Sequence, residues 1–535
     1  MKKIISVILS VLMIFAVMAP AVSAAEEQAV TIYVEGYGAT LRGKSGNQAF
    51  PVDLGLAEGL SSMLGDLLKN LAWAEVTGDY SAYSQQLYDL IAPAYADLTL
   101  DSNGEPTDLN GEFYYGLGYD PSVPREYYND KFDGGYYLFR YDWRLSVEYN
   151  AKVLEDFITN LGAKKVNLIG RCLGGNIVSA FLQNASAESI EKLNKVILYI
   201  PSTLGVDFIS ALFSGKVVLD PDAVDNYVTY SLADNDIIAG NGEDAELFEG
   251  LTTIVNFINE VYVLGYGTDV VERIVDAVRE DALARILRDS YASFPSFWAM
   301  VTPEDMEDAI DFIYNTPELK AEYSGMIEKI RSYHQNVQLK AADRIRKLNE
   351  AGKEIMIISK YNYADFPLSA KAAQQSDGTA GTYATSFGAT VAPFGQILSE
   401  SYIKSMKKEN VKYLSDDKMI DASTCVLPET TWFIKNLYHS VFPTSVDALM
   451  NAFLTTKGMT VDTYDEYPQY LKYDKQTGEL SPVTGLDEGD IIDKDSLYSK
   501  STVFMKILKM ILDFLTKLLG GQIKLPSLGG ITGQA

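Results

Sequence analysis

One short stretch of the chain, residues 166–178, contains a cysteine in a setting that suits nucleophilic chemistry. An apolar run rich in Val, Leu and Ile reaches Gly170, Cys172 follows, and Gly174 opens a stretch compatible with a helix. This G-x-C-x-G pattern predicts the strand–turn–helix elbow on which hydrolases carry their nucleophile, usually a serine. The two glycines form the structural elbow, because side chains there would clash where strand and helix approach. The helix N-terminus would favour the reactive thiolate of Cys172.

A nucleophile of this kind needs a base, and the whole chain contains two histidines, His334 and His439. The elbow fold orders its catalytic residues along the chain as nucleophile, acid and base. His439 follows every acid candidate, whereas His334 precedes them and lies in a polar helical run. We therefore predict that His439 is the base and that His334 is an exposed helix residue.

The acid candidates come after a near-continuous apolar segment, residues 354–359, which is predicted to be a buried strand. Asp365 lies nearer the end of this strand, where many hydrolases carry their acid. Asp377 lies further on, in the turn sequence Ser-Asp-Gly-Thr. Either carboxylate would orient the imidazole of His439 and stabilise its cation.

Further motifs complete a resemblance to a known family. The segment Tyr141-Asp142-Trp143-Arg144 precedes the elbow, and Ser376-Asp377-Gly378-Thr379 follows it. Together with the late His439, this order resembles the lecithin:cholesterol acyltransferase-like branch of the α/β-hydrolases, over about residues 30 to 445. The resemblance implies that Asp377 is the acid, with Asp365 as the alternative. The chain departs from the family at Cys172, which stands where serine is usual. With its cysteine, the elbow is also similar to that of polyhydroxyalkanoate synthases.

The same resemblance indicates where an oxyanion hole would lie. One donor is the backbone N–H of the residue after the nucleophile, here Leu173, and the other comes from a loop after an early strand. Residues 30–34 are predicted to be that strand, and the Gly-rich turn after it places the second donor at Tyr37, with Gly36 as the alternative. An ordinary strand-ending turn is the competing interpretation of this loop.

The elements that must position these residues alternate between strands and helices. This alternation predicts a mostly parallel central sheet flanked by helices, the α/β-hydrolase fold, with a helical cap insertion and a C-terminal extension. Asp142 and Arg144 are predicted to form a buried pair that ties a strand end to the fold. The predicted elements are strands at 136–141, 165–170 and 195–200 and helices at 146–161 and 341–351.

The chain is long enough for several structural regions. The expected regions are a signal peptide (1–24), the first half of the core (25–204), the cap (205–340), the second half of the core (341–445), an irregular extension (446–502), an amphipathic helix (503–519) and a flexible tail (520–535). The amphipathic helix has two open roles, docking on the body of the protein or contact with a lipid or membrane interface.

The N-terminus and the charge indicate where the protein works. Lys2 and Lys3, a short apolar run and a small-residue site predict a secretory signal cleaved after Ala24, and therefore a secreted protein. The formal net charge of −27 argues against nucleic acid as a partner, because a strongly acidic chain repels it.

The two cysteines, Cys172 and Cys425, leave three possibilities for the thiol at the elbow. It is a free catalytic thiol, it is bridged to Cys425, or it is a free but unreactive thiol. No metal cluster and no cofactor fingerprint is visible in the sequence.

These observations predict an acyl ester hydrolase or O-acyltransferase. Cys172, His439 and Asp377 would act on a small-molecule or lipid ester or thioester through a covalent thioester intermediate. The alternative from another class is a catalytically inactive hydrolase fold that serves as an extracellular binding or surface protein.

Overall fold

We describe a computed structural model of the chain. It describes residues 29–38, 41–43, 48–50, 66, 69–71, 73–74, 76–106, 114–116, 126–218, 221–232 and 276–492. The predicted signal peptide, the amphipathic helix at 503–519 and the tail lie outside these residues and stay predictions.

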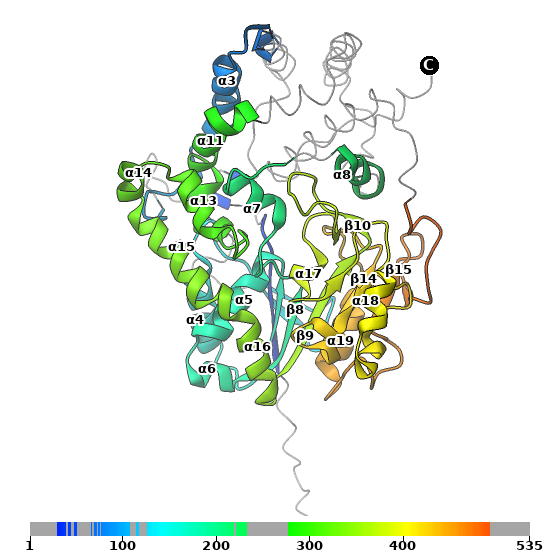
Figure 1. The fold of residues 1–535 in the computed structure, drawn as a ribbon. Helices are drawn as coiled ribbons and strands as arrows, with labels where there is room; N and C mark the ends of the chain where they lie inside the picture. Colours follow the sequence, from blue (N-terminus) through cyan, green and yellow to red (C-terminus); the bar gives the residue numbers. More distant parts are fainter. Residues whose placement is uncertain are drawn as a thin grey trace, which may run out of the picture.

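A nine-stranded sheet forms the centre of the molecule (Figure 1). Its inner pairs are parallel, and only the pairs at the two edges, β5 with β6 and β15 with β16, are antiparallel. The predicted mostly parallel α/β sheet is therefore confirmed. In spatial order the strands are β16 (Leu480–Pro482), β15 (Tyr470–Tyr473), β14 (Thr431–Lys435), β9 (Glu354–Tyr361), β8 (Leu193–Tyr199), β7 (Val166–Arg171), β1 (Val30–Val34), β6 (Tyr136–Phe139) and β5 (Glu126–Tyr128).

Both faces of the sheet are covered, which explains why its strands read as continuous apolar runs. Successive residues of a strand point to opposite faces. Leu168 therefore packs in the core on one face, while Ile169 packs in a separate core on the other. Val196 and Ile197 of β8 divide in the same way.

Helices form the outer layers of the fold (Figure 1). Helices α4 (Val147–Asn160), α5 (Leu173–Asn184) and α16 (Ala341–Glu350) cover one face, and α19 (Thr444–Thr455) covers the other. Helix α4 begins where the sequence predicts, because the side chain of Ser146 accepts a hydrogen bond from Tyr149 N–H at 3.1 Å. Further helices are α3 (Ser81–Ile91), α6 (Ala187–Glu191), α17 (Thr382–Thr385) and α18 (Glu400–Ser405).

The segment expected to form a cap, 205–340, is helical over much of its described part. Its buried side chains, such as Trp298 and Ile310, belong to the same hydrophobic core as those of α4 and α5. A role of this segment as a cap over the site stays a prediction. Its helices are α7 (Asp207–Phe213), α8 (Pro221–Asn226), α11 (Ala284–Arg288), α12 (Pro295–Trp298), α13 (Met306–Ile313), α14 (Pro317–Glu322) and α15 (Ser324–Asn336).

The segment 446–502 is not the irregular extension that we expected. Most of α19 belongs to it, and β15 and β16 from this segment complete the central sheet. The wrong expectation has a physical cause, since strands of three or four residues carry almost no periodic pattern. A buried ammonium group also attaches this segment to β14. Lys435 Nζ, on β14, lies 2.5 Å from Asp490 and 3.2 Å from both Asp417 and Asp487.

The predicted buried pair of Asp142 and Arg144 is confirmed. The guanidinium donates two hydrogen bonds to the carboxylate, at 3.0 and 2.7 Å, and a third to the carbonyl of Leu98 at 3.2 Å. Both side chains are almost completely buried. The pair thus attaches the chain just after β6 to the loop that contains Leu98.

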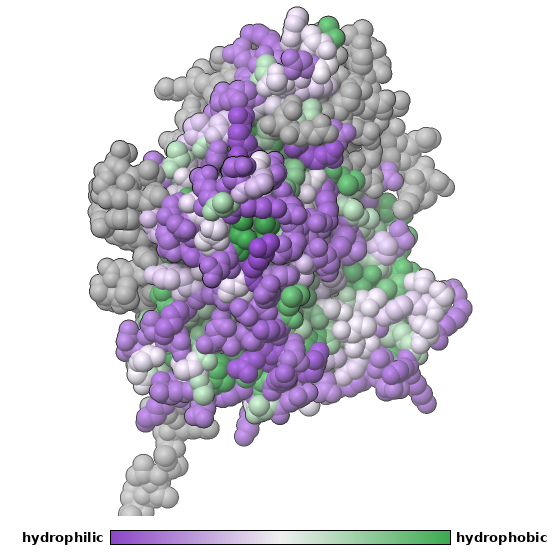
Figure 2. All heavy atoms as spheres, turned by 60° about the vertical axis from the view of Figure 1, so that its left-hand side comes forward, coloured by the Kyte–Doolittle hydropathy of each residue, from purple (hydrophilic) through white to green (hydrophobic). Residues whose placement is uncertain are grey.

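One face of the molecule is mainly polar (Figure 2). Figure 2 shows hydrophilic residues over most of the face turned forward, with hydrophobic residues in separate patches. Within the described ranges, no helix is both long and apolar enough to cross a membrane.

Replacing Arg144 should be far more damaging than replacing an exposed arginine. In Arg144→Met the carboxylate of Asp142 stays buried without its cation, so the free energy of unfolding should fall by about 3–5 kcal/mol. The control is Arg331→Met, which breaks the exposed pair with Glu307 and should cost less than about 1 kcal/mol. Urea denaturation followed by circular dichroism measures both, and equal losses would contradict the structural role of the buried pair.

Candidate active site

The backbone of Cys172 has the conformation of a sharp turn between a strand and a helix. Its φ is +50°, in the left-handed region that non-glycine residues rarely adopt. It follows β7 directly and is the N-cap of α5. Its own N–H donates to the carbonyl of Tyr199 on the neighbouring strand at 3.0 Å. The side chain therefore stands at the carboxyl edge of the sheet, where the helix dipole favours an anion.

Close packing at the turn explains the elbow glycines. A Cβ atom on Gly174 would lie 2.3 Å from the carbonyl oxygen of Val34 and 2.5 Å from that of Glu35. A Cβ atom on Gly170 would lie 2.8 Å from the carbonyl oxygen of Gly174. Helix α5 can approach β1 this closely only without side chains at these positions.

The structure brings Cys172, His439 and Asp377 together. His439 Nδ1 lies 2.7 Å from Asp377 Oδ2, and its backbone N–H donates to the Asp377 carbonyl at 2.8 Å. Because Nδ1 is engaged by the carboxylate, the other ring nitrogen is left for Cys172, whose thiol lies close enough to the imidazole for each group to shift the pKa of the other.

The loop around Asp377 holds its carboxylate in one orientation. The side chain is fully buried, and Oδ1 accepts hydrogen bonds from the N–H groups of Thr379 at 3.0 Å and Ala380 at 2.8 Å. Gly378 has a φ of +88°, and a Cβ atom there would lie 2.2 Å from the ring of Tyr438. Only glycine lets the acid loop lie this close to the residue that precedes His439.

The three groups form a charged chain. Burial would raise the pKa of the Cys172 thiol, but the hydrogen bond and positive charge of His439 and the N–H of Leu173 lower it below its usual value. Burial likewise opposes the imidazolium, yet Asp377 and Cys172 raise the pKa of His439 to about 9. The pKa of Asp377 is lowered in turn, because His439 outweighs the effect of its burial. These shifts all favour the form of the site in which a thiolate and an imidazolium are paired and a carboxylate supports them.

The loop after β1 lies against the nucleophile, as the oxyanion prediction requires. A Cβ atom on Gly36 would lie 3.2 Å from the Cβ atom of Cys172. The ring of Tyr37 packs edge-on against Trp143 at 4.8 Å and Phe297 at 5.1 Å. Leu173 supplies an N–H at the start of α5 that is bonded to the thiol. Both candidate donor segments thus border Cys172.

The other candidates from the sequence do not take part in the contacts among Cys172, His439 and Asp377. Asp365 is fully buried, and its carboxylate accepts a hydrogen bond from Phe366 N–H at 2.8 Å. His334 is partly buried on α15 and lies 2.9 Å from Gln338. Cys172 and Cys425 are both free thiols, and burial raises the pKa of Cys425 to about 12. Of the two acid candidates, Asp377 is therefore the one whose carboxylate contacts His439.

Sequence reasoning missed one charged residue beneath the site, Lys360. Its side chain is fully buried, and burial lowers its pKa to about 7 against the opposing effect of Asp377. Three carbonyl oxygens surround its Nζ, which favours the ammonium form. The signal was present in the sequence, since a lysine at the end of an otherwise apolar strand is rarely buried without a partner.

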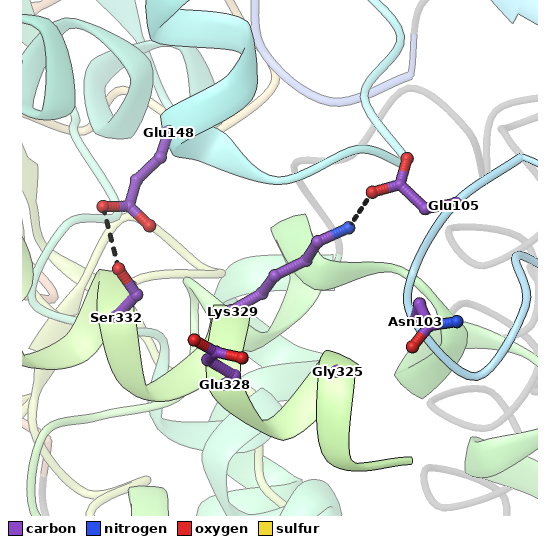
Figure 3. A pocket seen from close by; sticks show the side chains of 7 residues that line it. All are labelled: Asn103, Glu105, Glu148, Gly325, Glu328, Lys329 and Ser332. Carbon is purple, nitrogen blue, oxygen red and sulfur yellow. Dashed lines mark hydrogen bonds and ion pairs between the residues drawn. The ribbon is translucent and has the colours of Figure 1, made fainter. Parts of the chain in front are cut away.

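A separate hollow of about 350 Å³ lies between α15 and the loop at residues 101–105 (Figure 3). Glu105, Glu148 and Glu328 line it with Lys329, and no residue of the thiol–imidazole–carboxylate chain takes part. Lys329 is paired with Glu105, and Ser332 donates to Glu148 at 3.3 Å. Across the described part of the chain, no group of three or more His, Cys, Asp or Glu side chains is placed to hold a metal ion.

Comparisons of this chain with family models, curated proteins and solved structures found no match.

Alkylation of the two thiols should rise with pH in different ranges. Iodoacetamide should modify Cys172 faster at pH 7 than it modifies an ordinary thiol, because a lowered pKa increases the thiolate fraction. The rate should fall only when the pH drops through that lowered pKa. Cys425 is the internal control, which should stay unmodified at pH 7 because its pKa is raised to about 12. Peptide mapping reports both sites.

The variant His439→Ala tests the cause of this reactivity. Without the imidazolium, burial is the main influence on the thiol pKa and should raise it. Cys172 should then be alkylated at least about tenfold more slowly at pH 7. His334→Ala is the matched control and should label like the wild type. An unchanged rate in His439→Ala would refute the ion pair.

The close approach of α5 to β1 at Gly174 leads to a further prediction. Gly174→Ala should force α5 away from β1, lower the free energy of unfolding by about 1–3 kcal/mol and slow the alkylation of Cys172. The control is Gly162→Ala, where φ is +64° and no atom lies within 4 Å of the new Cβ. That variant should lose about 1 kcal/mol from backbone strain alone and keep the wild-type rate of alkylation. Equal alkylation rates in the two variants would contradict the packing argument.

Proposed function

We propose that this chain is an acyl-transferring hydrolase of the α/β-hydrolase type, which acts on an ester or thioester through Cys172, His439 and Asp377. The observation that carries the proposal is the connected thiol, imidazole and carboxylate, with the cysteine at φ +50° at the start of a helix. A strained nucleophile of this kind, with its base oriented by an acid, is the general arrangement for covalent acyl transfer.

The topology of the sheet supports the finer assignment of the fold. The nucleophile follows β7, the acid lies after β9, and the base follows β14, all at the carboxyl edge of parallel strands. This chain order of nucleophile, acid and base is the order of the α/β-hydrolases. The same edge is where open α/β sheets generally bind ligands.

The reaction begins with the thiolate of Cys172, which attacks the carbonyl carbon of the substrate. The negative charge that develops on the carbonyl oxygen is stabilised by the N–H of Leu173 and by the loop at Gly36 and Tyr37. Each such donor typically contributes about 2.7–4 kcal/mol. The imidazolium of His439 gives its proton to the departing alcohol or thiol, and a thioester remains on Cys172.

The second half of the reaction uses the same histidine as a base. The negative charge on sulfur is lost when the thioester forms, and this charge is one of the causes that raise the pKa of His439. The imidazole, now neutral, accepts a proton from water or an acceptor alcohol that attacks the thioester. Asp377 stabilises the imidazolium that forms, and the thiolate is released.

The alternative, an inactive binding protein, has less support. A bridge between Cys172 and Cys425 would have favoured it, and both cysteines are free thiols. No specific observation favours that function over acyl transfer.

Hydrolysis of p-nitrophenyl acyl esters by the purified protein tests the proposal. Cys172→Ala and His439→Ala should each reduce kcat by at least about a thousandfold, because the groups act as a unit. A brief reaction followed by acid quenching should leave the acyl mass on the Cys172 peptide. Activity that survives Cys172→Ala would exclude the proposal.

The two buried aspartates give a matched pair for the acid. Asp377→Asn should lower kcat by about a thousandfold or more, because the amide favours the wrong orientation and tautomer of the imidazole. Asp365→Asn alters an equally buried carboxylate and should keep most of the activity. The reverse ranking would assign the acid to Asp365.

A further inference from the structure

Lys360 lies beneath the loop that carries His439. Its Nζ donates hydrogen bonds to the backbone carbonyls of Tyr438 at 3.0 Å, His439 at 3.1 Å and Val441 at 2.9 Å. Three acceptors match the three N–H donors of an ammonium group. One side chain on β9 therefore holds the backbone on both sides of the base.

Aromatic rings of the surroundings hold the same ammonium. Nζ lies 4.6 Å from the ring centre of Phe442, in the His439 loop, and 5.0 Å from that of Tyr199 on β8. The guanidinium of Arg171, the residue before Cys172, lies 4.2 Å from the same Phe442 ring. Cation–π contacts of desolvated cations are among the stronger ones. The loop is thus tied both to β9 and to the strand that ends at the nucleophile.

Regular secondary structure does not fix this loop. Residues 436–443, between β14 and α19, form neither helix nor strand. The position of the imidazole relative to Cys172 therefore depends on individual contacts of the loop, among which are the backbone and carboxylate of Asp377 and the ammonium of Lys360.

We propose that Lys360 is a positioning residue, which holds the main chain of the His439 loop so that the imidazole stays paired with the thiolate of Cys172. The proposal rests on the thiol–imidazole pair of the proposed function. It does not require that the substrate be an ester, because the property that it concerns is the ionisation of Cys172.

Lys195 offers a matched control. It is also a buried lysine, with an exposed fraction of 5%, and its Nζ donates to the carbonyls of Phe453 and Thr456 at 2.5 Å each. It lies near the start of β8, at the opposite edge of the sheet from Cys172. Its loss removes similar hydrogen bonds, together with an ion pair to Glu354 at 3.0 Å, without contact to the site.

The experiment is the pH profile of Cys172 alkylation by iodoacetamide in Lys360→Met, Lys360→Gln and Lys195→Met. In Lys360→Met all three hydrogen bonds are lost, and alkylation at pH 6 should be about tenfold slower than in the wild type, which corresponds to a rise of one unit in the thiol pKa. Lys360→Gln keeps amide N–H donors for the carbonyls, so its alkylation rate should lie between that of the wild type and that of Lys360→Met. Lys195→Met should keep the wild-type profile.

The outcomes separate the proposal from its alternatives. A wild-type pH profile in Lys360→Met would overturn the proposal. Equal shifts of the profile in Lys360→Met and Lys360→Gln would also overturn it, because the effect would then come from the loss of a charge near Asp377, Arg171 and Cys172. If Lys360→Met does not fold, a wild-type profile in Lys360→Gln overturns the proposal. A wild-type Cys172 with an ordinary thiol pKa would remove this proposal and the proposed function together. A low pKa without any ester hydrolysis would remove only the function.

Discussion

The buried carboxylate of Asp377 is the constraint on which the site depends. A charge fully removed from water is costly unless it is hydrogen-bonded and paired. Two backbone N–H groups occupy one oxygen and the imidazole of His439 occupies the other. The carboxylate thereby favours the cationic form of His439, and the imidazolium in turn lowers the pKa of the Cys172 thiol. The proton distribution at the elbow is thus decided at a residue more than 200 positions away in sequence, which is why the sheet must align both loops at one edge.

Aromatic packing holds a second loop beside Cys172, the one that follows β1. The ring of Tyr37 is held between Trp143 and Phe297, which come from the segment after β6 and from α12. The main chain of Trp143 also accepts a hydrogen bond from Ser296. The loop at Gly36 and Tyr37 is therefore fixed by contacts to two distant segments. This provides the rigidity that an oxyanion hole needs, because its donors must be in place before charge develops.

The sequence analysis anticipated those parts of the protein whose physics is local. The strand at Val30–Val34, the turn at Cys172 and the helix after Ser146 follow from apolar runs, glycine spacing and a capping side chain. The order of nucleophile, acid and base also selected His439, and the family resemblance favoured Asp377 over Asp365. Features that depend on the completed sheet were missed. The strand β15 has only four residues, and the role of Lys360 is defined by three carbonyls that the chain supplies some eighty residues later.

The place of β15 and β16 in the sheet has a consequence for how the protein is made. Synthesis proceeds from the N-terminus, so β14 is complete before its neighbour β15, at Tyr470–Tyr473, exists. During this interval an apolar strand presents unpaired N–H and C=O groups, which is the kind of edge that templates aggregation. The carboxylates that neutralise Lys435 from this side, Asp487 and Asp490, arrive later still. The pairing of β15 with β14 therefore covers a strand edge that would otherwise stay open, and Asp487 and Asp490 neutralise the lysine at its end.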